Sequence, residues 1–282
     1  MKVLRAPLVI LGGCLVGGFT ILALLAPLLA PYDPRALAGS GLEPPSADHL
    51  LGTNLIGQDI LSRIIWGSRS ALEVGVGAAT LAVVMGVLVG VSAGLLGGVV
   101  DTLAMRTVDV LLALPNLPLV VLFAALTGGN RAGLILLMGI LFFPPISRIV
   151  RSQALSLRQR GFMAAAQGFG GGVLYLIRRH FVPALGPIIV AEFVAFVGNA
   201  ISLEAGLAFL GLGDPTGVSW GMMMREALAT SGIYFTPAWM WWVLPPGFAV
   251  TLAILGFAFL GVGLEPLMNP RSESRSMRAI QS

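Results

Sequence analysis

The clearest shortage in this sequence is charge. Only 11% of its 282 residues are charged and 56% are hydrophobic, whereas an ordinary soluble domain has about 25% charged residues. This composition excludes a water-soluble globule. Lysine is nearly absent too, since Lys2 is the only one, and a P-loop needs a lysine inside its glycine-rich motif. The sequence therefore excludes an ATPase site of that kind, and we expect the chain not to be an enzyme.

Cysteine and histidine are equally scarce. Cys14 is the only cysteine, so no intramolecular disulfide can form, and the two histidines, His49 and His180, lie far apart in the sequence. Metal sites in proteins need several such ligands at close spacing. We therefore predict that this chain itself binds neither a metal nor a cofactor.

What the sequence does contain is a series of long apolar intervals. The intervals without any Asp, Glu, Lys or Arg are 6–32, 74–100, 110–130, 132–147 and 227–264. A helix needs about 20 apolar residues to cross the core of a bilayer. We therefore predict an all-α membrane protein with six transmembrane helices. Their expected ranges are 8–30, 72–99, 107–127, 132–147, 185–204 and 241–264.

Positive residues are distributed unequally across the expected membrane. With the N-terminus inside, 12 of the 17 Lys and Arg residues fall in inner segments, and the positive-inside rule then places both termini in the cytoplasm. The inner positions are Lys2, Arg5, Arg106, Arg148, Arg151, Arg158, Arg160, Arg178, Arg179, Arg271, Arg275 and Arg278. Because they lie in short loops instead of one basic domain, they indicate contact with membrane lipid and not with nucleic acid.

This orientation divides the chain into three parts. Residues 1–70 hold the first helix and an extracytoplasmic segment, residues 71–270 form the transmembrane core, and residues 271–282 form a cytoplasmic tail. Inside the core, residues 147–186 are expected to form the longest cytoplasmic loop. Pro144 and Pro145 remove two backbone donors just before this loop, so we expect them to interrupt the fourth helix.

The second predicted helix carries a regular row of glycines. Gly86, Gly90, Gly94 and Gly98 recur every four residues and so share one helix face, where another backbone can approach closely. The stretch from Gly90 to Gly94 also matches, formally, the nucleophile elbow of hydrolases around Ser92. That elbow requires a strand, a sharp turn and nearby His and acid partners, none of which this uncharged run offers. An intramembrane hydrolase using Ser92 therefore remains only as an alternative function.

The inner loop combines positive charge with a short helical pattern. Residues 147–186 contain six arginines and no acid. The run Ala164-Ala165-Ala166 favours a short helix, the glycines at 170–172 end it, and Pro183 begins the return to the membrane. Attraction to anionic lipid would explain the arginines, but it would not explain a helix placed between glycines and a proline.

This loop resembles the signature loop of binding-protein-dependent ABC permeases, in which Glu-Ala-Ala precedes a Gly and, further on, an apolar residue and Pro. Ala164-Ala165-Ala166, Gly170 and Val182-Pro183 match this pattern, although the family usually has Glu at the position of Ala164. The resemblance implies a coupling helix that docks on an ATPase subunit. The implied coupling residues are Phe162, Met163, Ala164, Ala165, Ala166, Gln167, Gly170 and Pro183.

Further segments resemble the second permease of dipeptide and oligopeptide importers, and together they cover most of the chain. They are 26–34, 49–54, 57–63, 105–110, 114–115, 204–213, 219–223 and 261–264. Gln58 departs from the family, which more often has Arg there. The resemblance implies a type I ABC importer permease fold in the cytoplasmic membrane of a bacterium. It also implies that the chain translocates short peptides by alternating access, with nickel chelates or glutathione as alternative substrates.

The same resemblance implies the partners of the chain. A second permease subunit would complete the translocation pathway as a heterodimer. Two ATPase subunits would bind ATP and Mg and supply the energy, and an extracytoplasmic solute-binding protein would deliver the substrate.

The fifth predicted helix carries polar residues at membrane depth. Glu192 lies near its middle and Glu204 at its outer end, with Asn199 and Ser202 between them. A carboxylate inside a span is tolerated mainly beside water or a partner, so we predict that these four residues line the substrate pathway. Interhelical hydrogen bonds are the alternative for Asn199 and Glu204. A secondary transporter driven by an ion gradient through Glu192 is the alternative function.

Aromatic residues gather near the expected ends of the spans. They are Tyr32, Trp66, Trp220, Trp239, Trp241 and Trp242. Amphipathic rings of this kind are typical of the membrane–water interface, so we expect them to form interfacial belts.

Overall fold

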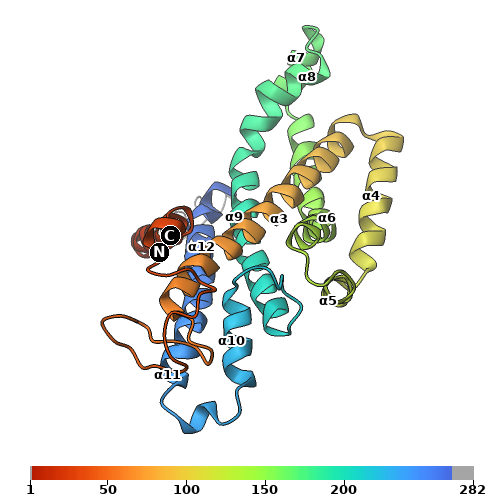
Figure 1. Ribbon diagram of the computed structural model, residues 1–282. Coiled ribbons are helices and arrows are strands. Elements are labelled where there is room, and N and C mark those ends of the chain that lie inside the picture. Colours follow the sequence, from red (N-terminus) through yellow and green to blue (C-terminus); the bar gives the residue numbers. More distant parts are fainter. Residues whose placement is uncertain (1, 269–282) are drawn as a thin grey trace, which may run out of the picture.

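The chain folds into helices joined by loops (Figure 1). The computed structural model describes residues 2–268, and within them the only β-type pairing is an isolated bridge between Thr53 and Asp59. The helices are α1 (Lys2–Leu24), α2 (Ala26–Leu29), α3 (Ile60–Leu96), α4 (Gly98–Ala113), α5 (Asn116–Thr127), α6 (Arg131–Arg158), α7 (Gly161–Gly168), α8 (Val173–Leu176), the π-helical turn η1 (Ile177–Phe181), α9 (Val182–Phe209), α10 (Trp220–Ala229), the 3-10 turn η2 (Ile233–Phe235), α11 (Trp239–Trp242) and α12 (Leu244–Met268). The predicted tail 271–282 lies outside the described residues.

Several of these helices can cross a membrane. Within the described residues, five helical stretches are long and apolar enough: Pro7–Leu24, Ile60–Leu96, Arg131–Arg158, Ile177–Phe209 and Trp239–Leu264. A sixth span results when α4 and α5 are counted as one, although the two helices are bent by 76° at the break between them. The predicted all-helical membrane fold with six spans is confirmed in this form.

The third span is broken, which corrects the continuous helix expected at 107–127. α4 ends at Ala113, and α5 begins at Asn116. Leu114 adopts an extended backbone with ψ 138°, because a residue that precedes a proline is disfavoured in the helical region. Pro115 then occupies the N-cap position of α5. The sequence Leu114-Pro115 therefore ends one helix and starts another.

The fourth span, in contrast, continues through the two prolines at which we expected an interruption. α6 includes Pro144 and Pro145 and ends only at Arg158, so the predicted loop 147–186 begins as a helix. Packing along α3 keeps this helix intact across the missing backbone donors.

α3 is also longer than predicted. It begins at Ile60 instead of near residue 72, because the Asp59 carboxylate caps its first turn by accepting the Ser62 N–H at 2.8 Å, and an Asp at this position stabilises a helix start. The predicted division of the chain at residue 70 therefore falls inside one continuous helix.

Glycines bring α3 and α6 into close contact. A Cβ at Gly86 would lie 2.7 Å from Ile146, one at Gly90 would lie 2.6 Å from the Ser147 carbonyl oxygen, and one at Gly94 would lie 2.6 Å from Ala154. Three of the four predicted packing glycines thus lie on the α3–α6 interface.

Gly98 differs from the other three, so the prediction for it was wrong. It is the first residue of α4, with a φ of +55°, and a Cβ there would meet nothing within 4 Å. α3 ends before the fourth repeat of the pattern, because Gly97 adopts φ +68° and terminates the helix.

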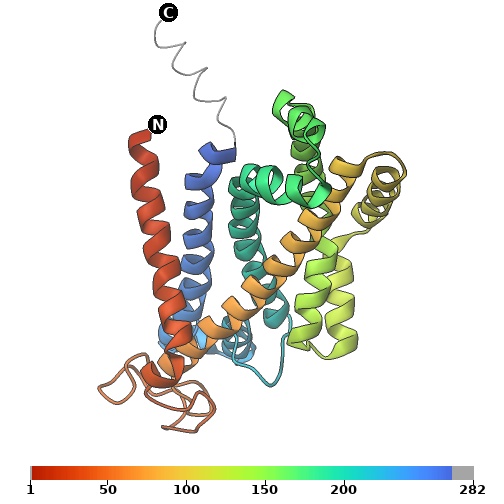
Figure 2. The same ribbon diagram turned by 90° about the horizontal axis from the view of Figure 1, so that it is seen from above.

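The ends of the helices and the loops between them gather at two opposite sides of the molecule (Figure 2). The start of α1, the end of α12 and α7 lie toward one side, which we term the α7 side. The segment 30–59 and the turns around α10 and α11 lie toward the opposite side. α1 and α12 run next to each other and pack together. The first turns of α1 and the last turns of α12 therefore share a side with α7.

Polar contacts hold the segment 30–59 on the first turns of α3. His49 and Asp59 are both buried, and the His49 Nδ1 atom lies 3.0 Å from Asp59 Oδ1. The Ser40 N–H donates a hydrogen bond to Glu43 and holds the pKa of that carboxyl below its ordinary value. This side of the chain is therefore an ordered part of the fold.

The region after α9 is equally anchored. The buried Arg63 guanidinium makes two hydrogen bonds, of 2.6 and 2.9 Å, to the Glu226 carboxylate of α10. Trp220 and Trp242 are each only 1% exposed, and the Trp220 indole N–H donates to the Ile64 carbonyl oxygen at 3.0 Å. These two rings belong to the core, which corrects their expected place in an interfacial belt.

Candidate functional site

The first candidate surface is formed by α7. The alanine run lies within this helix, as the sequence predicts. Met163 is fully buried and anchors the short helix to the rest of the chain. Its end has the geometry of a glycine cap. Gly170 adopts φ +82°, and the Gly171 N–H donates to the Ala166 carbonyl oxygen at 2.9 Å.

Two exposed aromatic rings flank this short helix. Phe169, beside Gly170, is 94% exposed, and Phe162, in the first turn, is 46% exposed. The Phe162 ring also lies 5.5 Å from the ring of His180 in η1, which holds α7 against the start of α9. Exposed phenylalanines at the tip of a protruding element favour a protein-binding surface.

The charge around α7 is positive. Arg148 and Arg151 of the inner region pair with Asp109 and Asp101 of α4. The other four arginines of this region are exposed, and none takes part in an ion pair among the described residues. They are Arg158, Arg160, Arg178 and Arg179. Val182 and Pro183 are also exposed, at the start of α9. The α7 surface is therefore apolar at its tip and basic around it.

The second candidate surface is one face of α9. Glu192, Asn199 and Ser202 are spaced by seven and then three residues, so they lie along the same side of the helix. Asn199 and Ser202 are exposed and Glu192 is half-buried, and the residue between them on this face, Ala195, is small and exposed. The structure thus brings together three of the four predicted pathway residues.

Glu204, the fourth predicted pathway residue, lies elsewhere. It is only 6% exposed and lies near Ser219 and Arg131, away from the Asn199 face. Its position matches the alternative, an interhelical contact near the end of the span, and does not support a place in the pathway.

A cavity of about 590 Å³ lies where the α9 face meets the break between α4 and α5. One wall consists of Pro115, Asn116, Leu117 and Pro118, and the facing wall includes Asn199 and Ser202. Asn116 was not singled out in the sequence. The only signal in the sequence was the pair of prolines on either side of it, Pro115 and Pro118, which disfavour a continuous helix.

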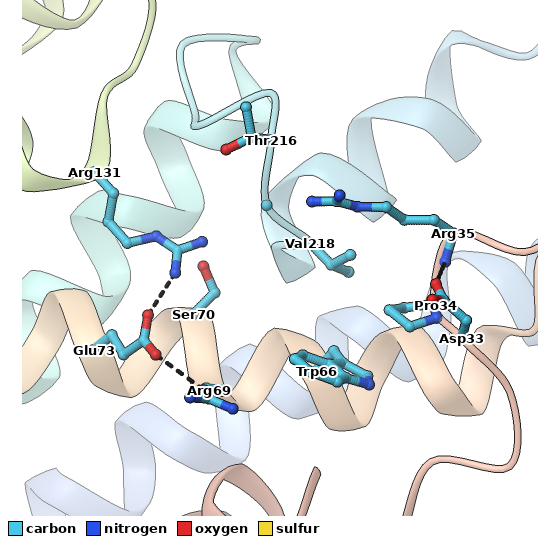
Figure 3. A pocket seen from close by; sticks show the side chains of 11 residues that line it. Asp33, Pro34, Arg35, Trp66, Arg69, Ser70, Glu73, Arg131, Thr216 and Val218 are labelled. Carbon is cyan, nitrogen blue, oxygen red and sulfur yellow. Dashed lines mark hydrogen bonds and ion pairs between the residues drawn. The ribbon is translucent and has the colours of Figure 1, made fainter. Parts of the chain in front are cut away.

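A third site is a charged pocket of about 330 Å³ on the side opposite α7 (Figure 3). Arg131 at the start of α6 binds Glu73 of α3, which also pairs with Arg69 at 3.0 Å. Arg131 additionally lies 3.6 Å from Asp214, in the loop after α9. Arg35 contributes a guanidinium on the other side of the pocket. These ion pairs connect α3, α6 and the loop after α9.

Known proteins share this sequence over most of its length. Residues 86–274 match the family described as binding-protein-dependent transport system inner membrane component. The dipeptide transport system permease protein of Alkalihalophilus pseudofirmus is 36% identical over 270 residues, which cover 95% of this chain and 87% of the relative. The corresponding protein of Bacillus subtilis is 34% identical over 254 residues, 89% of this chain and 78% of the relative. A Brucella suis protein with peptide permease in its name is 37% identical over 249 residues, 88% of this chain and 82% of the relative.

Proposed function

Because this chain belongs to the family of inner membrane components of binding-protein-dependent transport systems, we propose that it imports short peptides through a bacterial cytoplasmic membrane, using ATP hydrolysed by separate subunits. Relatives named as dipeptide permeases support the peptide substrate. The observation that carries the coupling mechanism is α7, an exposed helix with a buried anchor at Met163 and exposed rings at Phe162 and Phe169.

α7 is the proposed contact with the ATPases. The complex would contain two ATPase subunits, each binding ATP and Mg, and the apolar tip of α7 would dock in a surface cleft of one of them. Phe162, Ala165 and Gly170 would face the ATPase, whereas the buried Met163 would transmit the movement to the transmembrane helices. Pro183 stands where η1 passes into α9. A displacement of α7 would therefore act directly on the helix that carries Glu192 and Asn199.

Two further partners complete the proposed transporter. A second permease subunit would face the open side of α9, where Asn199 and Ser202 are exposed, and the two chains would enclose the pathway between them. A solute-binding protein would dock on the side opposite α7, where the segment 30–59 and the pocket around Arg131 lie. Alternating access would result when ATP binding opens the helices on that side.

The rival functions receive less support. The Ser92 hydroxyl donates to the Val89 carbonyl oxygen at 3.0 Å, and the cavity beside it, of about 220 Å³, is lined by apolar side chains without a histidine or an acid. A hydrolase would need both partners near its serine. An ion-driven transporter that works through Glu192 would not explain why α7 has exposed phenylalanines at its tip and arginines around it. Nickel chelates and glutathione remain alternative substrates of the same architecture.

The orientation of the chain provides a direct test, because α7 can reach cytoplasmic ATPases only from the inner side. After Cys14 is replaced, single cysteines at Arg160 and Thr216 are expected to react with a membrane-impermeant maleimide from opposite sides. In intact cells the cysteine at 216 should be labelled, and the cysteine at 160 should be labelled only after the cells are opened. Labelling of both from the same side would contradict the proposed coupling.

A further inference from the structure

The break between α4 and α5 leaves backbone groups without helical partners inside the membrane. α5 has 12 residues and rises about 18 Å, so the break lies that far from the end of α5 near Thr127. In a bilayer core of about 30 Å this is well below the surface. Such an interruption is tolerated only where it is buried in protein or lines a hydrated cavity. The cavity of about 590 Å³ at this point meets that requirement.

The polar groups of this cavity are uncharged. Asn116 lines it from the break, and Asn199 and Ser202 line it from α9. The Asn116 side-chain oxygen is buried and accepts no hydrogen bond from the described residues. An amide offers donors and an acceptor, and a hydroxyl offers both. The cavity therefore presents hydrogen-bond donors and acceptors that can pair with the C=O and N–H groups of a peptide.

The same face of α9 carries a carboxyl group outside the residues that line this cavity. Glu192 lies on the same face as Asn199, seven residues toward the α7 side, a distance of about 10 Å along the helix. A fully extended tripeptide spans about 10 to 11 Å. Ala195, between the two positions on this face, is small and exposed.

From these positions we infer that the cavity binds the main chain of a peptide in transit, through Asn116, Asn199 and Ser202, with the peptide ammonium directed toward Glu192. This inference rests on the proposed function and assigns the bound peptide a direction. Its amino end points toward the cytoplasm. Because the cavity pairs with main-chain groups, peptides with different side chains bind it alike.

Two photoreactive tripeptides test the direction as well as the site. In photoleucine-Ala-Ala the reactive group is at the amino end, and in Ala-Ala-photoleucine it is at the carboxyl end. Each is irradiated while the complete transporter, with its partner permease, ATPases and binding protein, imports it into proteoliposomes. The first peptide is expected to label residues around 192–195, and the second to label 115–118 or 199–203.

The outcomes separate the inference from the function on which it rests. ATP-dependent uptake with adducts outside these segments, or with the two patterns exchanged, would overturn the inference and leave the function intact. Absence of ATP-dependent uptake would overturn both.

A substitution at the cavity gives an independent measurement. Asn199→Leu is expected to lower the tripeptide uptake rate about tenfold, because a peptide group loses its partner in the cavity, and Ser202→Ala is expected to lower it less. Ser92→Ala, which removes a hydroxyl of α3 away from this cavity, is the matched control and should transport normally. Copurification of the ATPases verifies that each variant is assembled. Normal uptake by assembled Asn199→Leu and Ser202→Ala would contradict the assignment.

Discussion

Replacing Phe169 by Asp is expected to abolish peptide uptake and to release the ATPase subunits from the membrane complex. The Phe169 ring is 94% exposed at the tip of α7, and burying such a ring in a partner contributes about 1.5–3 kcal/mol. A carboxylate in its place loses that contribution and must in addition be desolvated in an apolar cleft. The affinity for the ATPases should therefore fall by more than about tenfold, measured by copurification of the ATPases with a tagged chain.

Phe235 offers a matched control for this substitution. It is 95% exposed and lies in η2, in the stretch between α10 and α11 on the side opposite α7. Phe235→Asp makes the same chemical change at the same exposure, and it should leave copurification of the ATPases unchanged. Equal loss of the ATPases in both variants would indicate a general defect of folding and would contradict a specific role for α7.

Replacing Gly90 by Val is expected to give the largest loss of stability within the chain. The new Cβ would lie 2.6 Å from the Ser147 carbonyl oxygen and 2.8 Å from Val150, so α3 and α6 must move apart around this contact. Overpacking in a core typically costs about 1–3 kcal/mol, and here the obstacle is backbone, which cannot rotate away. Thermal unfolding of the purified chain in detergent should show a clear decrease in the midpoint.

A glycine in α1 serves as the reference for this measurement. Gly13 is exposed, and a Cβ there would meet nothing within 4 Å, so Gly13→Val should unfold at nearly the temperature of the unchanged chain. If Gly90→Val unfolded at the same temperature as Gly13→Val, the close α3–α6 contact through the glycine face would be wrong.

The spans and the α7 helix could be predicted from the sequence because each depends on a local property. Apolar length sets a span, and an alanine run followed by glycines sets a short helix. The glycine repeat on α3 similarly identified the interface at Gly86, Gly90 and Gly94. The prediction from this repeat failed at Gly98 because α3 already ends at Gly97, one residue earlier.

The residues at which helices end were less predictable, because packing between helices can override the tendency of prolines to end a helix. Pro144 and Pro145 look like an interruption, yet α6 continues through them because it packs on α3. Leu114-Pro115 looks much the same in the sequence and does end a helix. Nothing local distinguishes these prolines, so only the packing of each helix against its neighbours decides the outcome.

The candidate site was predictable in its composition and not in its geometry. Polar residues within a span identified Glu192, Asn199 and Ser202, which do share a face of α9. Glu204 carries the same carboxyl group but is buried, because its position on the helix turns it toward Ser219 and Arg131. Asn116 was missed because its role depends on a break in the helix that brings it opposite α9.

Uptake of a labelled dipeptide into proteoliposomes tests the central claim most directly. The vesicles contain this chain with its partner permease and ATPases, the binding protein is added outside, and ATP is enclosed. The account predicts that the peptide accumulates only with enclosed ATP and with the ATPases present, and that accumulation persists when ionophores dissipate ion gradients. Peptide accumulation by this chain without ATPases, driven by an ion gradient and abolished by ionophores, would contradict it.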